Sequence, residues 1–167
     1  MTAQVLQNEI TELAPSHGLR EEQRRTVAEA LAGPLADAFR LSINLRALHW
    51  NVEGPLFYSV HKLTEEQYEA MTSTIDEFAE RIRALGLRAP QTLREFQEQS
   101  DIDDLPDRKE LKARIDRVVE DYERAVARMA VAAELAEKHS DIKTADLLTE
   151  KIGDFEENAW MLRATTA

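Results

Sequence analysis

Four long stretches of this chain repeat apolar residues at alternating spacings of three and four. That spacing places the residues on one face of an α-helix, so each stretch is predicted to form an amphipathic helix with a buried face. The chain has five Gly and five Pro among 167 residues, which favours long helices over a turn-rich β fold. We therefore expect an all-α protein of one domain. The clearest repeat runs through Tyr68, Met71, Ile75, Phe78, Ile82 and Leu85.

Breaks in this pattern divide the chain into an N-terminal arm, residues 1–19, and a helical domain, residues 20–167. Gly33–Pro34 falls inside the first helix and is expected to kink it or to split off its leading turn. Residues 87–106 form a crossover long enough to pass the end of a bundle, with room for a short helix at 92–97. Short links with one long crossover indicate a ferritin-like four-helix bundle. The long helices are expected at residues 20–51, 59–85, 107–138 and 141–163.

Composition restricts the chemistry that the chain can perform. It contains no cysteine, which excludes disulfides and cysteine-ligated metal sites, so a metal would need His and carboxylate ligands. No basic region followed by an apolar run opens the sequence, and no stretch approaches the roughly 20 apolar residues that cross a bilayer. We expect a soluble, cytoplasmic protein. Its net charge of −11 favours cationic ligands over nucleic acid.

The second expected helix carries two pairs of residues that could each bind a cation. His61 and Glu65 form the first pair, and Asp76 and Glu80 form the second. Residues four apart share a helix face, and here that face points away from the apolar stripe. A solvated surface is the commoner explanation for such carboxylates. His61 and Asp76 lie roughly 22 Å apart at about 1.5 Å per residue, so a single ion cannot bind both pairs of one chain.

A site that uses both pairs would need two chains. A second copy of the helix, antiparallel across a two-fold axis, would bring His61 and Glu65 beside the partner subunit's Asp76 and Glu80. His49 ends the first helix, and because the following loop turns the chain back, His49 and His61 are expected to converge. Imidazole and carboxylate ligands suit iron, manganese or zinc, and a mixed set with open positions suits redox iron best.

The stretch "LHWNVEGPLFYSVHKLTEEQYE", followed by "DEFAERIRALG", resembles the Dps family of mini-ferritins, the DNA-binding proteins from starved cells. The resemblance extends to "DIKTADLLTEKI" and "NAWMLRA" and so covers most of residues 20–165. It implies a hollow dodecamer with ferroxidase centres at two-fold interfaces. These centres would oxidise ferrous iron, preferentially with hydrogen peroxide over dioxygen, and the ferric product would be stored as mineral inside the shell.

The resemblance also assigns residues to the ferroxidase centre. His49, His61 and Glu65 would come from one subunit, and Asp76 and Glu80 from its partner. Position 65 holds Glu where many members of the family have Asp, so this ligand is one methylene longer. Beside His49, Trp50 matches the family's tryptophan near the centre, where an indole could intercept a stray oxidising equivalent. A large apolar anchor in a subunit interface would explain Trp50 equally well.

A second group of acids lies at the start of the fourth expected helix. Asp141, Asp146 and Glu150 match family acids that line a negative pore on a three-fold axis, through which iron would enter. A ring of carboxylates suits that task because it focuses an electric field on a narrow aqueous path. Complementing the positive end of the helix dipole is a sufficient explanation for Asp141 alone.

Direct DNA binding is not expected, although the family name suggests it. Family members that hold DNA through their tails use Lys- and Arg-rich extensions, whereas residues 1–19 contain no Lys or Arg and carry Glu9 and Glu12. Without a basic tail that can release counterions on binding phosphate, little electrostatic affinity is available. We expect no appreciable binding at physiological salt unless divalent cations bridge the two.

Three other functions compete with that of a ferroxidase mini-ferritin. A 24-subunit ferritin or bacterioferritin would bind two irons within one chain through Glu-x-x-His motifs. That possibility is disfavoured, because no histidine has Glu three residues before it. The others are a non-catalytic helical shell with solvated acids, and a Dps protein that protects DNA mainly by binding it. The residues found three positions before the histidines are Ala14, Arg46, Tyr58 and Ala136.

Overall fold

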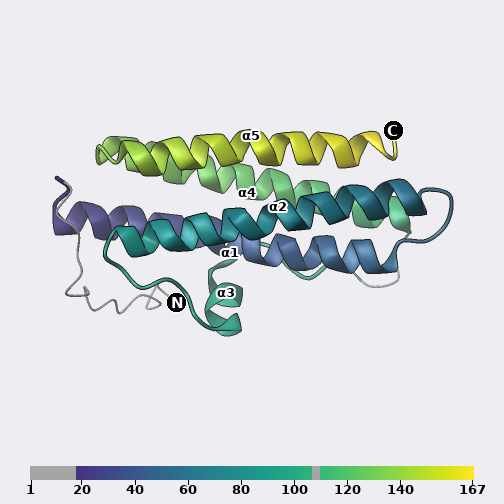
Figure 1. The fold of residues 1–167 in the computed structure, drawn as a ribbon, viewed down its shortest axis with the longest axis horizontal. Helices are drawn as coiled ribbons and strands as arrows, with labels where there is room; N and C mark the ends of the chain where they lie inside the picture. The colour runs from purple at the N-terminus through teal and green to yellow at the C-terminus, as the bar shows by residue number, and fades with distance from the viewer. Residues whose placement is uncertain (1–17, 107–109) are drawn as a thin grey trace.

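The computed structural model describes residues 18–106 and 110–167, and its regular structure there is entirely helical. Four long helices lie side by side, and a short one lies beside the first (Figure 1). The predicted all-α four-helix bundle is confirmed, whereas the arm expected at residues 1–19 falls almost wholly outside the described residues. In the part of the chain described, no helix has the length and apolar character needed to cross a membrane. The helices are α1 (Glu21–Asn51), α2 (Phe57–Ala84), α3 (Leu93–Gln99), α4 (Leu111–Lys138) and α5 (Ile142–Ala164).

The helix boundaries agree best with the sequence where a cap or a break marks them. α2 begins at Phe57, two residues before the expected Ser59. α4 begins at Leu111 and not at Asp107, because the backbone of Glu110 is extended (φ −54°, ψ 148°) and caps the helix. Residues 107–109 lie outside the described chain. Apolar spacing marks the buried face of a helix but not its first turn, and this explains the early start predicted for α4.

α1 continues through Gly33–Pro34, so the expected division of this helix does not occur. A proline inside a helix removes one hydrogen bond and costs about 3 kcal/mol. Full burial of Leu31 and Leu35 on either side offsets this cost. Gly33 also makes room for a neighbouring helix, since a Cβ atom there would lie 2.3 Å from Nε of Arg128 in α4.

The crossover between α2 and α4 runs alongside α1 instead of passing the end of the bundle (Figure 1). Near the middle of α1, Asp37 accepts a 2.8 Å hydrogen bond from the amide of Asp101. Two turns further on, Asn44 donates to the carbonyl of Asp103 at 2.9 Å and accepts from the amide of Leu105 at 3.0 Å. The segment after α3 is therefore parallel to α1 and bound to it along its length.

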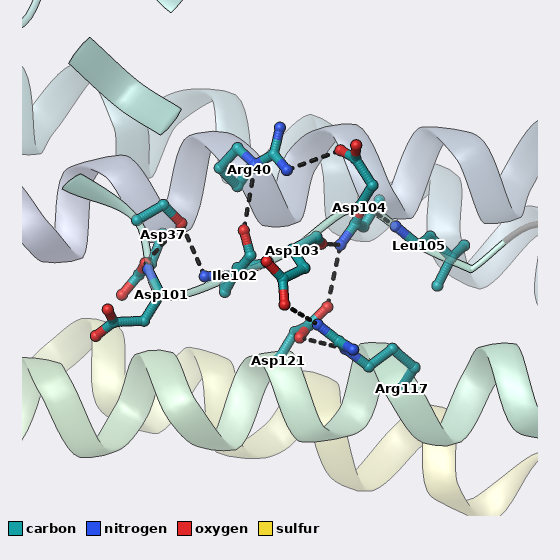
Figure 2. A network of polar contacts seen from close by, with 11 residues as sticks. Asp37, Arg40, Asp101, Ile102, Asp103, Asp104, Leu105, Arg117 and Asp121 are labelled. Carbon is teal, nitrogen blue, oxygen red and sulfur yellow. Dashed lines mark hydrogen bonds and ion pairs between the residues drawn. The ribbon is translucent and has the colours of Figure 1, made fainter. Parts of the chain in front are cut away.

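Two fully buried aspartates anchor this segment between α1 and α4 (Figure 2). Asp37 of α1 pairs with Arg128 of α4 at 3.2 Å. Asp121 of α4 pairs with Arg117 at 2.9 Å and accepts from Asn44 at 3.0 Å. Burial raises the pKa of both carboxyl groups above the usual range, although the arginines partly counteract it. We refer to these contacts as the crossover clamp; it consists of Asp37, Asn44, Ser100, Asp101, Asp103, Leu105, Arg117, Asp121 and Arg128.

Candidate metal centre

His49, at the end of α1, and His61, in the second turn of α2, meet where the chain reverses. Their rings stack with centroids 3.8 Å apart and an interplanar angle of 15°. Nδ1 of His49 lies 2.8 Å from the carbonyl oxygen of His61, and Nδ1 of His61 lies 3.0 Å from the carbonyl oxygen of His49. A carbonyl can only accept, so each Nδ1 carries the proton and donates it. In the neutral rings both Nε2 atoms are therefore left with a lone pair, as metal ligation requires.

Aromatic side chains hold the two imidazoles in this orientation. Phe57 stacks on His61 with ring centroids 5.0 Å apart. Tyr68 meets His49 edge-on at 5.2 Å, and the guanidinium of Arg46 lies 4.4 Å from the centroid of the Tyr68 ring. The sequence assigned Tyr68 to the apolar stripe of its helix, but its position two turns after His61 was a signal that it could reach the histidine pair. These contacts fix the rotation of the rings and so preorganise Nε2.

Glu65 lies one turn beyond His61, on the same side of α2. Its carboxylate accepts a hydrogen bond from the ammonium group of Lys62. This hydrogen bond, together with the charges of Lys62, His49 and His61, holds the pKa of the Glu65 carboxyl below its usual range, although partial desolvation opposes the shift. The same pair raises the pKa of Lys62. Glu65 is therefore an ionised carboxylate near both histidines at neutral pH.

Asp76 and Glu80 are exposed on the outer face of α2, further along the helix from the histidines. Asp76 opens into a shallow groove of about 560 Å³ on this face. Neither carboxylate has a hydrogen bond or ion pair with another described residue of the chain. This face of α2 is open at the position where a second subunit would have to lie. The groove is lined by Glu69, Thr72, Ser73, Ile75, Asp76 and Ala79.

A single chain thus brings together only part of the predicted ligand set. His49 and His61 are in contact and Glu65 is close to them, whereas Asp76 and Glu80 are on a different part of α2. Within residues 18–106 and 110–167, no three His, Asp or Glu side chains converge to hold a metal ion. The assignment of all five residues to one centre stays a prediction that requires a second subunit.

Large apolar side chains around the histidine pair are exposed in the single chain. The side chain of Trp50 is 70% exposed although it directly follows the buried His49. Tyr58 is 73% exposed, and Phe57, which stacks on His61, is 47% exposed. Exposed aromatic groups at one point of a surface are typical of an interface with another protein.

Arg114 of α4 holds the end of α1 in place beside this site. Its guanidinium donates to the carbonyl oxygens of Ala47 at 3.0 Å and Asn51 at 3.3 Å. The Asn51 carbonyl is one of the last four of α1, which lack a backbone partner within the helix, and the Ala47 carbonyl also accepts from the side chain of Asn51 at 2.8 Å. Arg114 therefore positions the turn that carries His49. No sequence pattern indicates this contact, because Arg114 and the end of α1 lie on helices whose relative rotation the pattern does not define.

Asp141 has a structural role that the sequence only partly indicated. The tight link between α4 and α5 depends on Ser140 in a left-handed conformation (φ 63°) and places Asp141 as the N-cap of α5. Its carboxylate is buried, accepts two hydrogen bonds from Arg81 at 2.7 and 2.9 Å, and accepts from the amide and hydroxyl of Thr144. With its oxygens so occupied, Asp141 fits capping of α5 better than the lining of a pore.

Removal of the Asp141 carboxylate is expected to destabilise the fold in a pH-dependent manner. Burial raises its pKa, but the hydrogen bonds of Arg81 and Thr144 outweigh burial and lower the pKa below 3.8. A lowered pKa contributes stability that is fully present above about pH 4 and is lost as the pH falls through the folded-state value. Asp141→Ala should lower the free energy of unfolding by about 2–3 kcal/mol at pH 7 and by less below pH 4. Denaturant titration at both pH values, at one protein concentration, checks this.

Asp146 serves as the matched control for Asp141. It lies on the same helix but is exposed, and its only partner among the described residues is Lys143, at 3.2 Å. Asp146→Ala should change the unfolding free energy by no more than about 0.5 kcal/mol. Equal losses in the two variants would contradict the buried role of Asp141.

Of the three acids in the predicted pore, Asp146 and Glu150 are exposed to solvent. Asp146 lines a second groove, which lies at the start of α5 and has a volume of about 460 Å³. Glu150, one turn further, pairs with Lys151 at 3.5 Å. Ile142, also in this groove, is 80% exposed. Only assembly with other subunits could place these acids around a pore, so their role as an iron entry stays a prediction.

Comparison with known proteins agrees with this architecture. A family model described as a ferritin-like domain matches residues 28–167. A protein of Bacillus anthracis named "DNA protection during starvation protein 2" is 34% identical over 140 residues, which cover 84% of this chain and 96% of that protein. The chain belongs to the Dps family of ferritin-like proteins.

Solved structures of Dps proteins superpose closely on the chain. DpsC from Streptomyces coelicolor has a TM-score of 0.88 and 26% identity, covering 95% of this chain and 96% of that one. A Dps protein from Vibrio cholerae has a TM-score of 0.84 and 28% identity, covering 92% and 98%. That protein is described as a member of a broad superfamily of ferritin-like diiron-carboxylate proteins.

Proposed function

We propose that this protein is a ferroxidase and iron-storage mini-ferritin that acts in the cytoplasm as a hollow dodecamer. It oxidises ferrous iron, preferentially with hydrogen peroxide, and keeps the ferric product as mineral inside the shell. The observation that carries the proposal is the pair of His49 and His61, whose reciprocal Nδ1 hydrogen bonds leave both Nε2 atoms free beside the ionised Glu65. The diiron-carboxylate description of the Vibrio cholerae relative supports iron as the substrate.

Ferrous iron and hydrogen peroxide together generate hydroxyl radicals, and this reaction consumes both of them. Two ferrous ions each give up one electron, and hydrogen peroxide accepts both electrons and two protons to form two molecules of water. The carboxylate ligands stabilise the ferric product, because their negative charge and hard oxygen donors favour the higher charge of the ion. The oxidising stress that peroxide and free iron would cause is reduced in the same step.

The centre is completed across a two-fold axis. An antiparallel copy of α2 would place the partner subunit's Asp76 and Glu80 beside the histidine pair of the first subunit. Support comes from the groove at Asp76, from the unpaired state of both carboxylates among the described residues, and from the exposed aromatic residues next to His49. Each interface would contain two identical centres.

Trp50 has two compatible roles at such an interface. Its exposed indole would be covered by the partner subunit and so would contribute to the stability of the dimer. Because it directly follows His49, it also lies where it could give an electron to a stray oxidising equivalent and so spare other residues.

Iron would enter through a pore on a three-fold axis, with Asp146 and Glu150 along its wall. Both are exposed carboxylates at the start of α5, and a ring of them would attract divalent cations. Asp141 would stand behind them and hold the first turn of α5 in place through Arg81.

Protection of DNA, the role named for the Bacillus anthracis relative, would be indirect in this protein. The chain carries a net charge of −11, which repels phosphate at long range. We propose that it protects by removing iron and peroxide and not by coating DNA.

Ferrous oxidation by purified protein tests this function. The protein is loaded with ferrous iron without oxygen, then given peroxide or air, and ferric absorbance is followed. Asp76→Ala/Glu80→Ala should slow the peroxide-driven reaction at least about 100-fold. Loss of a residue that only orients a metal ligand already lowers activity about 10- to 100-fold, and here two proposed ligands are removed. Equal rates in wild type and in a variant of the same assembled mass would instead favour a non-catalytic shell.

A further inference from the structure

Lys62 lies inside the proposed ferroxidase half-site and is not among its ligands. It directly follows His61, and its Nζ is 2.5 Å from Oε2 of Glu65, one helical turn away. The two side chains are 51% and 31% exposed, so both are accessible to solvent in the single chain. The centre therefore contains a cation that is covalently attached to the protein and already bound to one of the expected ligands.

This arrangement sets Lys62 in competition with a metal ion. An ammonium group has only donors and a full positive charge, and it occupies Oε2 of Glu65, one of the two oxygens that the carboxylate would offer to a divalent cation. It also repels a second cation held by the neighbouring histidines, an interaction that salt screens because the site is accessible to water. A metal that binds Glu65 through Oε2, or through both oxygens, must therefore displace the lysine.

We propose that Lys62 acts as a tethered competitor that holds Glu65 while the centre is empty and is displaced when a divalent cation binds. The inference rests on the proposed ferroxidase function, since it assigns Glu65 to the metal. Lys62 thereby raises the concentration of free divalent ion at which the centre fills. An ion that binds weakly through oxygen alone does not displace it, whereas an ion that also binds the Nε2 atoms of His49 and His61 does.

The length of the Glu65 side chain makes this exchange feasible. The carboxylate can swing between Lys62 and the histidine pair by rotating its side-chain bonds, without movement of α2. Lys62 is equally free to withdraw, because its ammonium has no other partner among the described residues. Binding of the metal and release of the lysine are therefore coupled through one side chain.

Titration of the assembled protein with Co²⁺, followed through its visible absorbance, tests the inference without a redox reaction. Lys62→Gln removes the tethered charge and should lower the dissociation constant about fivefold at low salt, with a smaller change at high salt. Lys62→Arg keeps the charge and should bind Co²⁺ within about twofold of wild type. The matched control is Lys112→Gln, which removes an exposed lysine whose partner is Asp116 on α4 and not a proposed metal ligand, and which should leave the constant unchanged.

Further variants distinguish failure of this inference from failure of the proposed function. If Lys62→Gln binds Co²⁺ no more tightly than Lys112→Gln, while Asp76→Ala/Glu80→Ala abolishes binding, the centre exists but Lys62 does not compete in it. If Co²⁺ binding is absent, or is unaffected by Asp76→Ala/Glu80→Ala, the interfacial centre is itself refuted and the inference with it. A fivefold gain that Lys62→Arg does not reproduce supports the competition.

Discussion

Co-assembly of two variants that are each inactive is expected to restore about a quarter of the wild-type rate of ferrous oxidation. The first variant, His49→Ala/His61→Ala, lacks the imidazoles and keeps the acids. The second, Asp76→Ala/Glu80→Ala, lacks the acids and keeps the imidazoles. Each should assemble alone without one complete centre, because in the proposed arrangement every centre takes its histidines from one subunit and these two acids from the other.

The expected fraction follows from the two-fold symmetry. Random pairing of equal amounts makes half of the dimers mixed, and in a mixed dimer one of the two centres receives both intact halves while the other receives neither. Half of the dimers with half of their centres active gives about a quarter of the full activity. The variants are unfolded and refolded together, and the ferric absorbance after a peroxide pulse is compared with that of refolded wild type.

A mixture that lacks the same half in both subunits is the control for this experiment. His49→Ala refolded with His61→Ala keeps all the acids and still has no intact pair of histidines, so it should recover no activity beyond that of its components. If mixed dimers form, as shown by a mass tag on one variant, and the rate stays at background, the centre does not span the interface. Recovery well above one quarter would indicate centres that do not need both halves.

The helices were predictable because burial imposes a period on the sequence. The repeat from Tyr68 to Leu85 placed α2, and the short helix expected at 92–97 corresponds to α3, whose first turn has a capping box between Thr92 and Glu95. Nothing in an apolar repeat fixes where a helix begins, and so α4 was expected four residues early. Nor did it show that the long crossover runs along α1, because that path depends on polar contacts between residues distant in the sequence.

The candidate site was predictable to the extent that it follows from helix geometry. The turn between α1 and α2 required His49 and His61 to converge, and the spacing along α2 required Asp76 to be remote from them. The reciprocal hydrogen bonds of the histidines depend on the conformation of the loop, which the sequence did not give. The salt bridge between Arg81 and Asp141 joins α2 to α5, and a pattern within one helix contains no information about such a partner.

Asp37→Ala is expected to lower the free energy of unfolding by about 3–5 kcal/mol, the largest loss of stability among single substitutions in the crossover clamp. The variant leaves the guanidinium of Arg128, the amide of Asp101 and the hydroxyl of Ser100 without their buried acceptor. Hydrogen exchange should locate the effect, with faster exchange at the amide of Asp101. The amide of Leu105 should be affected less, because Asn44 still holds it.

Asp37→Asn distinguishes loss of the acceptor from loss of the charge. The amide oxygen can still accept from Ser100 and Asp101, and Arg128 loses the charge of Asp37 but keeps its ion pair with Asp101 at 3.2 Å, so this variant should cost about half as much as Asp37→Ala. Because burial raises the pKa of Asp37, the native state binds its proton more tightly than the unfolded chain does. The stability that Asp37 contributes to the wild type is therefore largest below about pH 4, and part of it is lost as the pH rises from there to neutrality. The deficit of Asp37→Asn should accordingly be larger in acid than at pH 7, opposite to that of Asp141→Ala. A deficit that instead vanishes in acid would mean that Asp37 stabilises the clamp through its charge.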